Sequence, residues 1–389
     1  MTHFDLQFSK LICFCQLNLS VGDSLSVNTE ESTYEFALNF AKFAVTVTNI
    51  PVNIVVTEKG KVSQSVPVDP DLLDIQRPPV KSQIMCRILD LNDYEYECNK
   101  DPDEIAASVV AINKFALLSE PLDLKRRIAV PWTIVAYPSR NFVEKTFANL
   151  TQNEVLAYFA KLLRLDNPNM IKYWANEAGL LNYREKELNS TKDKTIVLKN
   201  RQSKLTTQIV DGANWSSNYI TLKDNRSFFN FLPSQNIHTN LKNDATKGHI
   251  EASRDFYLFG KLIQKATFNI LNGRVVSYDA EIGKETLDAY FSTDDNANVV
   301  SSIYLCDEQS LESKYILKAA HPFYSFENTT SIILGGAIQD SLRDINDEVD
   351  LDSIKVNQAI ARVAIPVGDD FTEVSVGELH ILKDGSFQI

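Results

Sequence analysis

The chain has 389 residues, of which 44% are hydrophobic and 23% are charged, and its formal net charge is -12 at pH 7. This length suits two domains, each large enough to bury a core. The acidic balance excludes a nucleic-acid partner, because such surfaces need clustered lysine and arginine. No apolar run is long enough for a membrane helix, and the N-terminus lacks a basic start and a cleavage site. We therefore expect a cytoplasmic protein without a membrane partner.

The first half alternates helix and strand patterns. "FDLQFSKLICFCQL" has helical spacing, "SLSVNT" predicts a strand, and "EESTYEFALNFAKFAV" predicts a helix capped by Asn28 or Thr29. Further strands are expected in "VNIVVTE", "QIMCRILDL" and "VPWTIVAYPS", and a long helix in "DPDEIAASVVAINKFALLSEPLDLKRR". This repetition predicts an α/β domain whose parallel sheet is covered by helices on both faces.

From Thr151 onwards the pattern is helical and then strand-rich. "TQNE" is a capping box, and Pro168 precedes "NMIKYWANEAGLLNYREKELN", which predicts a bridging helix. After Ser190 short strands dominate, with hairpin turns predicted at Asn272-Gly273 and Asp384-Gly385. We expect an α/β domain with the bridging helices over residues 1–188 and an α+β, strand-rich domain over residues 189–389.

The cysteines indicate neither a disulfide framework nor a zinc knuckle. Their number is odd and no two have C-x-x-C spacing. We expect buried free thiols at all five positions, which are Cys13, Cys15, Cys86, Cys98 and Cys306.

The common catalytic motifs are absent, including phosphate-binding loops, the G-x-S-x-G elbow and close histidine pairs. Zinc ligands can converge from distant positions, so one hypothesis is a site built from His238, His249, His321 and Cys306. The simpler interpretation is that these histidines are hydrogen-bonded or lie on the surface. The acidic run at 344–353 lacks the glycine and the spacing of a calcium loop, which favours a solvated linker.

The order of several segments resembles the aminopeptidase T and aminopeptidase S family, also called thermophilic metalloproteases. The segments are "LNLSVGDSLSVNT", "WTIVAYPSRNFVEKTF", "YWANEAGLLNYREKELN", "LNGRVVSYDAEIGKETLDAYFSTDDNA" and "GELHILKDGSFQI". The resemblance runs from near residue 15 to residue 389. It implies a thermophilic metalloprotease-like two-domain fold, a cytoplasmic homodimer, and removal of N-terminal residues with two divalent metal ions.

The resemblance also places the family's site residues on this sequence. The P-x-x-E-[VI]-x-T turn corresponds to "PSQNIHT", and the T-x-H-L-A-L-G-x-x-Y run corresponds to "TTSIILGGAI". The G-E glutamate falls on "VVSSIY" and the H-x-D pair on "NQAIARVAI". Every family ligand, and the tyrosine thought to assist catalysis, is replaced at these positions: Asn236, Ser302, Ser331, Ile338, Ala361 and Val363.

These replacements predict a degenerate family member, that is, a pseudoenzyme. We expect it to have no cofactor and no catalytic or metal-binding residues. A partial ligand set would leave buried carboxylates repelling each other without metal, so complete replacement restores stability. The protein would then act as a peptide binder or as partner of an active homologue. One alternative is an active aminopeptidase whose site is rebuilt from His238, His249, Glu251 or Glu327. Another is a small-molecule role for the N-terminal half, at the carboxyl ends of its strands.

Overall fold

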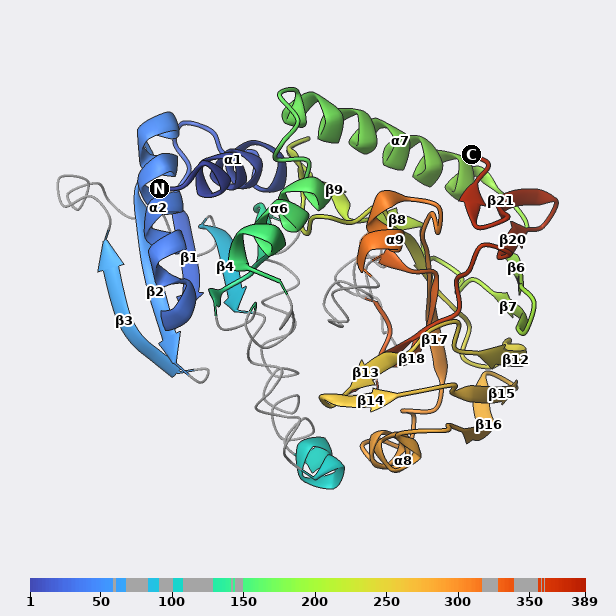
Figure 1. Cartoon of the computed structure of the whole chain (residues 1–389). Coiled ribbons are helices and arrows are strands. Elements are labelled where there is room, and N and C mark those ends of the chain that lie inside the picture. The colour runs from blue at the N-terminus through green and yellow to red at the C-terminus, as the bar shows by residue number, and fades with distance from the viewer. Residues whose placement is uncertain are drawn as a thin grey trace. The chain divides into compact units, whose positions relative to one another are not determined.

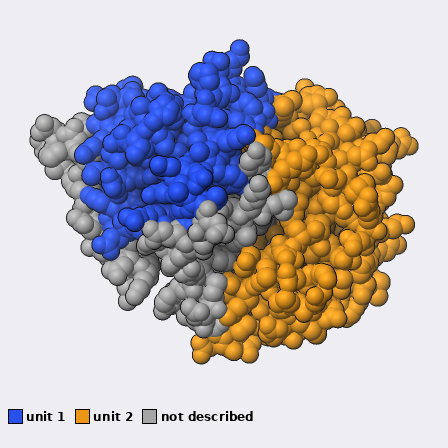
Figure 2. Space-filling view, in the orientation of Figure 1, with its two compact units in different colours: residues 1–93, 121–179, 218–233 blue, residues 94–120, 180–217, 234–389 orange. Residues whose placement is uncertain are grey.

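The structure is a computed structural model (Figure 1), and its described residues are 1–58, 61–67, 83–90, 101–107, 129–140, 143, 150–316, 328–338, 356–357, 359 and 361–389. They form two compact units, each discontinuous in sequence (Figure 2). Unit 1 comprises residues 1–93, 121–179 and 218–233, and unit 2 comprises residues 94–120, 180–217 and 234–389. The predicted domain boundary after residue 188 stays a prediction, and the bridging helix α7 (Met170–Ser190) contributes residues to both units.

Unit 1 contains the predicted parallel sheet. Its strand order is β3-β2-β1-β4-β5, in which β2, β1, β4 and β5 are parallel and only the edge strand β3 is antiparallel. The bounds are β1 Leu25–Glu30, β2 Val52–Glu58, β3 Lys61–Pro67, β4 Ile84–Asp90 and β5 Trp132–Tyr137. The α/β class is therefore confirmed. The hypothesis of a ligand at the carboxyl ends of these strands stays a prediction.

The helices of unit 1 follow the predicted pattern with one difference in a cap. They are α1 (His3–Leu11), continued by a π-helical turn (Ile12–Gln16), α2 (Tyr34–Thr48) and α6 (Gln152–Leu162). The prediction that Asn28 or Thr29 caps α2 is wrong, because both belong to β1 and pair with β2; Thr33 precedes α2 instead. The capping box of α6 is confirmed: Glu154 N donates to Thr151 Oγ1, and Thr151 N donates to a Glu154 carboxylate oxygen.

Unit 2 is strand-rich, as predicted. A five-stranded antiparallel sheet has the order β19-β18-β17-β11-β8, and an eight-stranded sheet has the order β16-β15-β12-β7-β6-β20-β21-β22. The first sheet consists of β8 (Ser216–Ser217), β11 (Ile237–Asn240), β17 (Val300–Leu305), β18 (Ser331–Gly335) and β19 (Arg362–Pro366). The second consists of β6 (Thr195–Lys199), β7 (Lys204–Gln208), β12 (Lys247–Glu251), β15 (Thr267–Leu271), β16 (Arg274–Asp279), β20 (Glu373–Val376), β21 (Leu379–Lys383) and β22 (Ser386–Phe387).

Several short elements lie between these sheets and helices. They are the pairs β9 (Tyr219–Thr221) with β10 (Ser227–Phe229) and β13 (Phe256–Leu258) with β14 (Lys261–Ile263), and the helices α8 (Lys284–Phe291) and α9 (Leu311–Ile316). Both predicted hairpin turns are confirmed. Asn272 and Gly273 have φ of 51° and 75°, and Asp384 and Gly385 have φ of 49° and 72°. Asparagine, aspartate and glycine tolerate this left-handed region best, which is why the sequence signal was reliable.

Four of the five cysteines, Cys13, Cys15, Cys86 and Cys306, are buried free thiols, as predicted. Burial raises the pKa of the Cys15 thiol to about 12, which keeps it protonated and unreactive. Cys98, residues 108–127 of the predicted long helix, and the acidic run at 344–353 lie outside the described residues. Within the described ranges, no helix has the length and apolar character needed to cross a membrane.

Gly335, at the end of β18, has a conformation and surroundings that allow no side chain. Its φ is +90°, and an added Cβ would collide with the carbonyl oxygen of Ala361 and the hydroxyl of Tyr290. We expect Gly335→Ala to lower the free energy of unfolding by about 3 kcal/mol or more, from backbone strain and overpacking together. Gly212→Ala is the matched control, because its φ of +85° is similar but nothing lies within 4 Å of the added Cβ. Urea denaturation of both variants measures the difference, and equal losses would contradict the role assigned to the close contacts.

Candidate functional site

One face of the five-stranded sheet collects most of the predicted site residues. In its register Asn240 lies opposite Ser302, and Tyr304 lies between His238 and Ser331. Because side chains alternate between the two faces of a strand, all five of these residues share one face. Ser302 and Ser331, which are 0% and 1% exposed, thus lie on the same face, and Asn236 lies just before β11 in the same alternation.

Ser302 belongs to a closed hydrogen-bond network around Asn240. The Ser302 hydroxyl donates to Asn240 Oδ1 at 2.7 Å, and Ile338 N donates to the same oxygen at 2.9 Å. Asn240 Nδ2 in turn donates to the carbonyl of Ile338 at 2.7 Å. Ile338 packs its side chain against Tyr304 and Ile333. Asn240 is fully buried and was not predicted from the sequence, although its spacing of two residues from His238 in a strand places it on the same face.

Asn236 forms a second group of contacts with His238. Asn236 Nδ2 donates to the Ser234 hydroxyl at 2.7 Å, which leaves Oδ1 to accept from His238 Nδ1 at 2.9 Å. An amide oxygen can only accept, so this orientation of the amide puts the proton on Nδ1. The imidazole stacks on the Tyr304 ring with 4.8 Å between the ring centroids. The histidine predicted to be hydrogen-bonded or exposed is therefore a buried, hydrogen-bonded one.

The remaining predicted positions are arranged differently. Ser331 is on the shared face and donates to the carbonyl of Thr329 at 3.0 Å. Val363 pairs with Leu334, and because side chains alternate along a strand, both point to the opposite face of the sheet. Ala361, two residues earlier, precedes β19. The β19 residues on the shared face are Arg362 and Ala364. Ala361 and Val363, which were predicted to belong to the site, therefore do not lie on the shared face. The pairing of β19 with β18 determines which β19 side chains point to that face.

The other candidate ligands do not converge within the described part of the chain. His249 lies in the eight-stranded sheet and contacts Asn269 Oδ1 through Nδ1, and Glu251 accepts from Gln202. Cys306 follows β17, and its backbone N donates to Thr330 Oγ1. His321 and Glu327 lie outside the described residues. Nowhere in the ranges that the structure describes do three His, Cys, Asp or Glu side chains gather as a metal-binding group.

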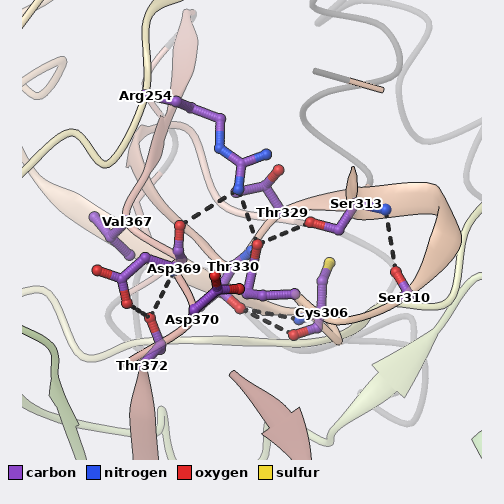
Figure 3. A network of polar contacts seen from close by, with 12 residues as sticks. Arg254, Cys306, Ser310, Ser313, Thr329, Thr330, Val367, Asp369, Asp370 and Thr372 are labelled. Carbon is purple, nitrogen blue, oxygen red and sulfur yellow. Dashed lines mark hydrogen bonds and ion pairs between the residues drawn. The ribbon is translucent and has the colours of Figure 1, made fainter. Parts of the chain in front are cut away.

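A buried ion pair joins Arg254 to Glu308, three residues after the end of β17. Figure 3 shows Arg254 within the network of polar contacts around Thr330. The Glu308 carboxylate lies 2.9 Å from Arg254 Nη2 and accepts from Ser313 Oγ at 2.9 Å and from Thr330 N at 2.6 Å. Its side chain is 1% exposed. Burial raises the pKa of Glu308 above its ordinary value, and the Arg254 charge and the hydrogen bonds from Thr330 and Ser313 oppose this. No local sequence pattern indicated this pair, whose members are 54 residues apart.

Thr330 links this pair to the predicted site residues. Its hydroxyl contacts both N and O of Cys306, and its carbonyl accepts from the backbone N–H groups of Val367 and Gly368 at 2.9 Å each. Ser331 follows it directly in β18. The ion pair therefore holds the segment that leads into the shared face.

The donor atoms on the shared face do not fit a pair of divalent metal ions. Such ions need carboxylates, imidazoles or thiolates, whereas the corresponding positions carry amides, hydroxyls and apolar groups. The amide and hydroxyl groups are occupied by one another or by backbone carbonyls. Only the imidazole of His238 is a strong metal ligand, and its Nδ1 is engaged with Asn236.

The sequence as a whole decides the family. A sequence model described as "Thermophilic metalloprotease (M29)" matches residues 6–387. The chain belongs to this family. It is 24% identical over 262 residues to aminopeptidase 2 of Geobacillus stearothermophilus, and 22% identical over 259 residues to aminopeptidase T of Thermus aquaticus. These matches cover 65% and 66% of this chain but only 62% of each relative's length.

Solved structures give the same architecture over the full length. Wild-type AmpT from Thermus thermophilus matches with a TM-score of 0.80 at 16% identity, covering 100% of this chain and 99% of that one. A 2,5-dihydroxypyridine dioxygenase from Pseudomonas putida KT2440 matches with a TM-score of 0.56 at 10% identity, covering 100% and 98%. At these identities the likeness concerns the fold alone. The predicted thermophilic metalloprotease-like fold is confirmed.

Family membership corrects the expectation about the cofactor. The prediction that no cofactor is expected is wrong, because the chain belongs to a family of metalloproteases, and this family implies divalent metal ions. The prediction followed from six sequence positions only, whereas the matched region spans nearly the whole chain. The structural finding is narrower: the side chains at the shared face do not supply the ligands of such a site.

Proposed function

We propose that this family member does not hydrolyse peptides at the shared face and acts by binding. The observation that carries the proposal is that the buried polar side chains of this face bond to one another in two groups, Ser302 with Asn240, and Asn236 with Ser234 and His238. Metallopeptidase hydrolysis depends on a bound water whose pKa is lowered by a metal ion held by charged or imidazole ligands. The buried amides and hydroxyls of this face hold each other instead.

Membership of the family supports a peptide as the class of ligand. A protein with an aminopeptidase fold that recognises peptides without hydrolysing them would bind a peptide or would pair with an active relative. We propose these two as the candidate partners. The homodimeric state and the cytoplasmic location implied by the family resemblance are kept as parts of the proposal. The relatives named as aminopeptidases support the peptide class, and the alignments with them leave out more than a third of each relative's length.

A mixture of unmodified synthetic peptides tests this function. The full-length protein is incubated with the mixture and cobalt, zinc or manganese, and free and bound peptides are then analysed by mass spectrometry. We expect the bound peptides to keep their N-terminal residues, with an active family aminopeptidase as the positive control that trims the same mixture. Progressive loss of N-terminal residues that depends on protein concentration and stops with a chelator would show an active enzyme.

A rebuilt active site is the alternative. Of its four proposed ligands, His238 is on the shared face, His249 and Glu251 belong to the other sheet, and Glu327 lies outside the described residues. No specific contact favours this alternative, and the peptide experiment distinguishes it from the main proposal.

A further inference from the structure

Three buried donor groups near the segment that follows β19 have no hydrogen-bond partner among the described residues. They are Nη1 of Arg254, Oγ1 of Thr329 and Oγ of Ser253. Ser253 N donates to the carbonyl of Pro366 at 2.8 Å, and Arg254 Nη2 lies 3.4 Å from the carbonyl of Gly368. Thr329 precedes Thr330, whose carbonyl accepts from Val367 and Gly368. Ser253 and Arg254, and Thr330 next to Thr329, thus all contact the same short segment, 366–368.

Buried donors of this kind are stabilised by an acceptor, because a desolvated N–H or O–H without one loses its bonds to water. A guanidinium edge matches the two oxygens of a carboxylate, and hydroxyl groups beside it can donate to the same oxygens. The Arg254 side chain is 15% exposed, so it is not sealed from solvent along its whole length. The chemistry of these groups thus favours a single carboxylate.

The neighbouring Glu308 decides how such a ligand could be held. Its carboxylate already faces Nη2 of the same guanidinium, so a second carboxylate would meet a like charge in a buried place. Burial raises the pKa of Glu308, which makes proton uptake there easier than at an exposed glutamate. Ser313 Oγ can accept from a protonated Glu308, because a hydroxyl both donates and accepts.

Other charged groups lie on the segments packed around Glu308. They are Arg254 before β13, Asp307 beside Glu308, Glu312 on α9, Asp369 and Asp370 after β19, and Asp384 in the last hairpin. Among the described charges, that of Arg254 lowers the pKa of the Glu308 carboxyl group.

We propose that Arg254, Thr329 and Ser253 form a docking site for one carboxylate group, and that Glu308 takes up one proton when this site fills. The carboxylate brings one negative charge and the proton cancels the charge of Glu308, so the net charge around Arg254 is unchanged. No covalent bond forms or breaks. The site lies outside the contacts of Asn236, Asn240 and Ser302 and does not depend on whether the protein hydrolyses peptides.

Titration calorimetry on the full-length protein tests the site with three probes. N-acetyl-L-alanine represents a peptide carboxyl terminus, acetate represents a free small acid, and N-acetyl-L-alaninamide is the uncharged control. We expect the first probe to bind more tightly at lower pH, by up to about tenfold per pH unit while one proton is taken up. Tighter binding of acetate than of N-acetyl-L-alanine would assign the site to small acids, which still supports the carboxylate class. Equal binding of acid and amide, or no binding of either acid, would overturn the proposal.

Two variants separate this site from a general effect on the fold. Thr329→Val keeps the shape and removes one donor, and we expect it to weaken binding of the acid severalfold at an unchanged melting temperature. Glu308→Gln removes the titrating group, and we expect binding without proton uptake, read from calorimetry in buffers of different ionisation enthalpy. Proton uptake that persists in Glu308→Gln would overturn the role of Glu308. If Glu308→Gln does not fold, the pH dependence of wild type and Thr329→Val still decides, because unchanged affinity in Thr329→Val contradicts the site.

Discussion

Replacing Glu308 with leucine while Arg254 remains is expected to lower the free energy of unfolding by about 3–5 kcal/mol. The glutamate side chain is 1% exposed and is the only ion-pair partner of Arg254 among the described residues, so its loss leaves a desolvated guanidinium. Thr330 N and Ser313 Oγ lose their acceptor in the same step. Chemical denaturation followed by circular dichroism measures the loss.

The double variant Arg254→Met with Glu308→Leu is the matched control. Replacing a buried ion pair by apolar side chains of similar size is often neutral or stabilising, so the double variant is expected to recover most of the stability. A double variant as unstable as Glu308→Leu would instead show that the hydrogen bonds to Thr330 and Ser313 dominate the contribution of this cluster.

The pH dependence of the same pair has a definite sign. Because burial raises the pKa of Glu308 above 4.5, the folded protein binds this proton more tightly than the unfolded chain does. The contribution of Glu308 to stability therefore falls as the pH rises from 4.5 through the raised pKa. In Glu308→Gln, which lacks the titrating carboxyl group, we expect this decrease in the free energy of unfolding with rising pH to be absent. A contribution that rises with pH over this window would mean that Arg254 outweighs the desolvation.

Introducing a carboxylate on the shared face is the second large effect that we expect. Ser302→Glu places a larger, charged side chain where Ser302 is 0% exposed and bonded to Asn240. Without a cation beside it, the carboxylate must lose its hydration or take up a proton, and its bulk must displace neighbours. We expect a loss of about 3 kcal/mol or more in the free energy of unfolding.

Ser302→Ala is the control for the lost hydrogen bond alone and is expected to lower the free energy of unfolding by about 1 kcal/mol. Thermal and urea denaturation of both variants, with and without added zinc, separates the contributions. If zinc restores the Ser302→Glu variant to wild-type stability, the surrounding residues still form a cation site, and the interpretation of this face as a closed neutral network is wrong.

Local chemistry made part of this fold predictable. The turns at Asn272-Gly273 and Asp384-Gly385 and the capping box at Thr151 depend on residues close in sequence, and all were confirmed. The cap of α2 was misplaced because the pairing of β1 with β2, a contact between distant segments, extends the strand beyond Asn28 and Thr29.

Contacts between distant segments decided the parts of the site that the sequence did not predict. Ser302 and Ser331 share a face because of the register of β17 with β18. Val363 points to the opposite face because of the register of β18 with β19. Asn240 reaches the backbone of Ile338, which is 98 residues away, and Arg254 reaches Glu308 across 54 residues. No pattern in a short stretch of sequence reports such contacts.

Hydrolysis of aminoacyl reporter substrates tests the central claim most directly, when wild type is compared with Asn236→Ala and Ser302→Ala. The purified protein is assayed with cobalt, zinc or manganese and with a chelator, beside an active family aminopeptidase. The account predicts no turnover above the metal blank in wild type or in either variant. Metal-dependent turnover by wild type would contradict it, and a decrease of that turnover in the variants would locate the activity at the shared face.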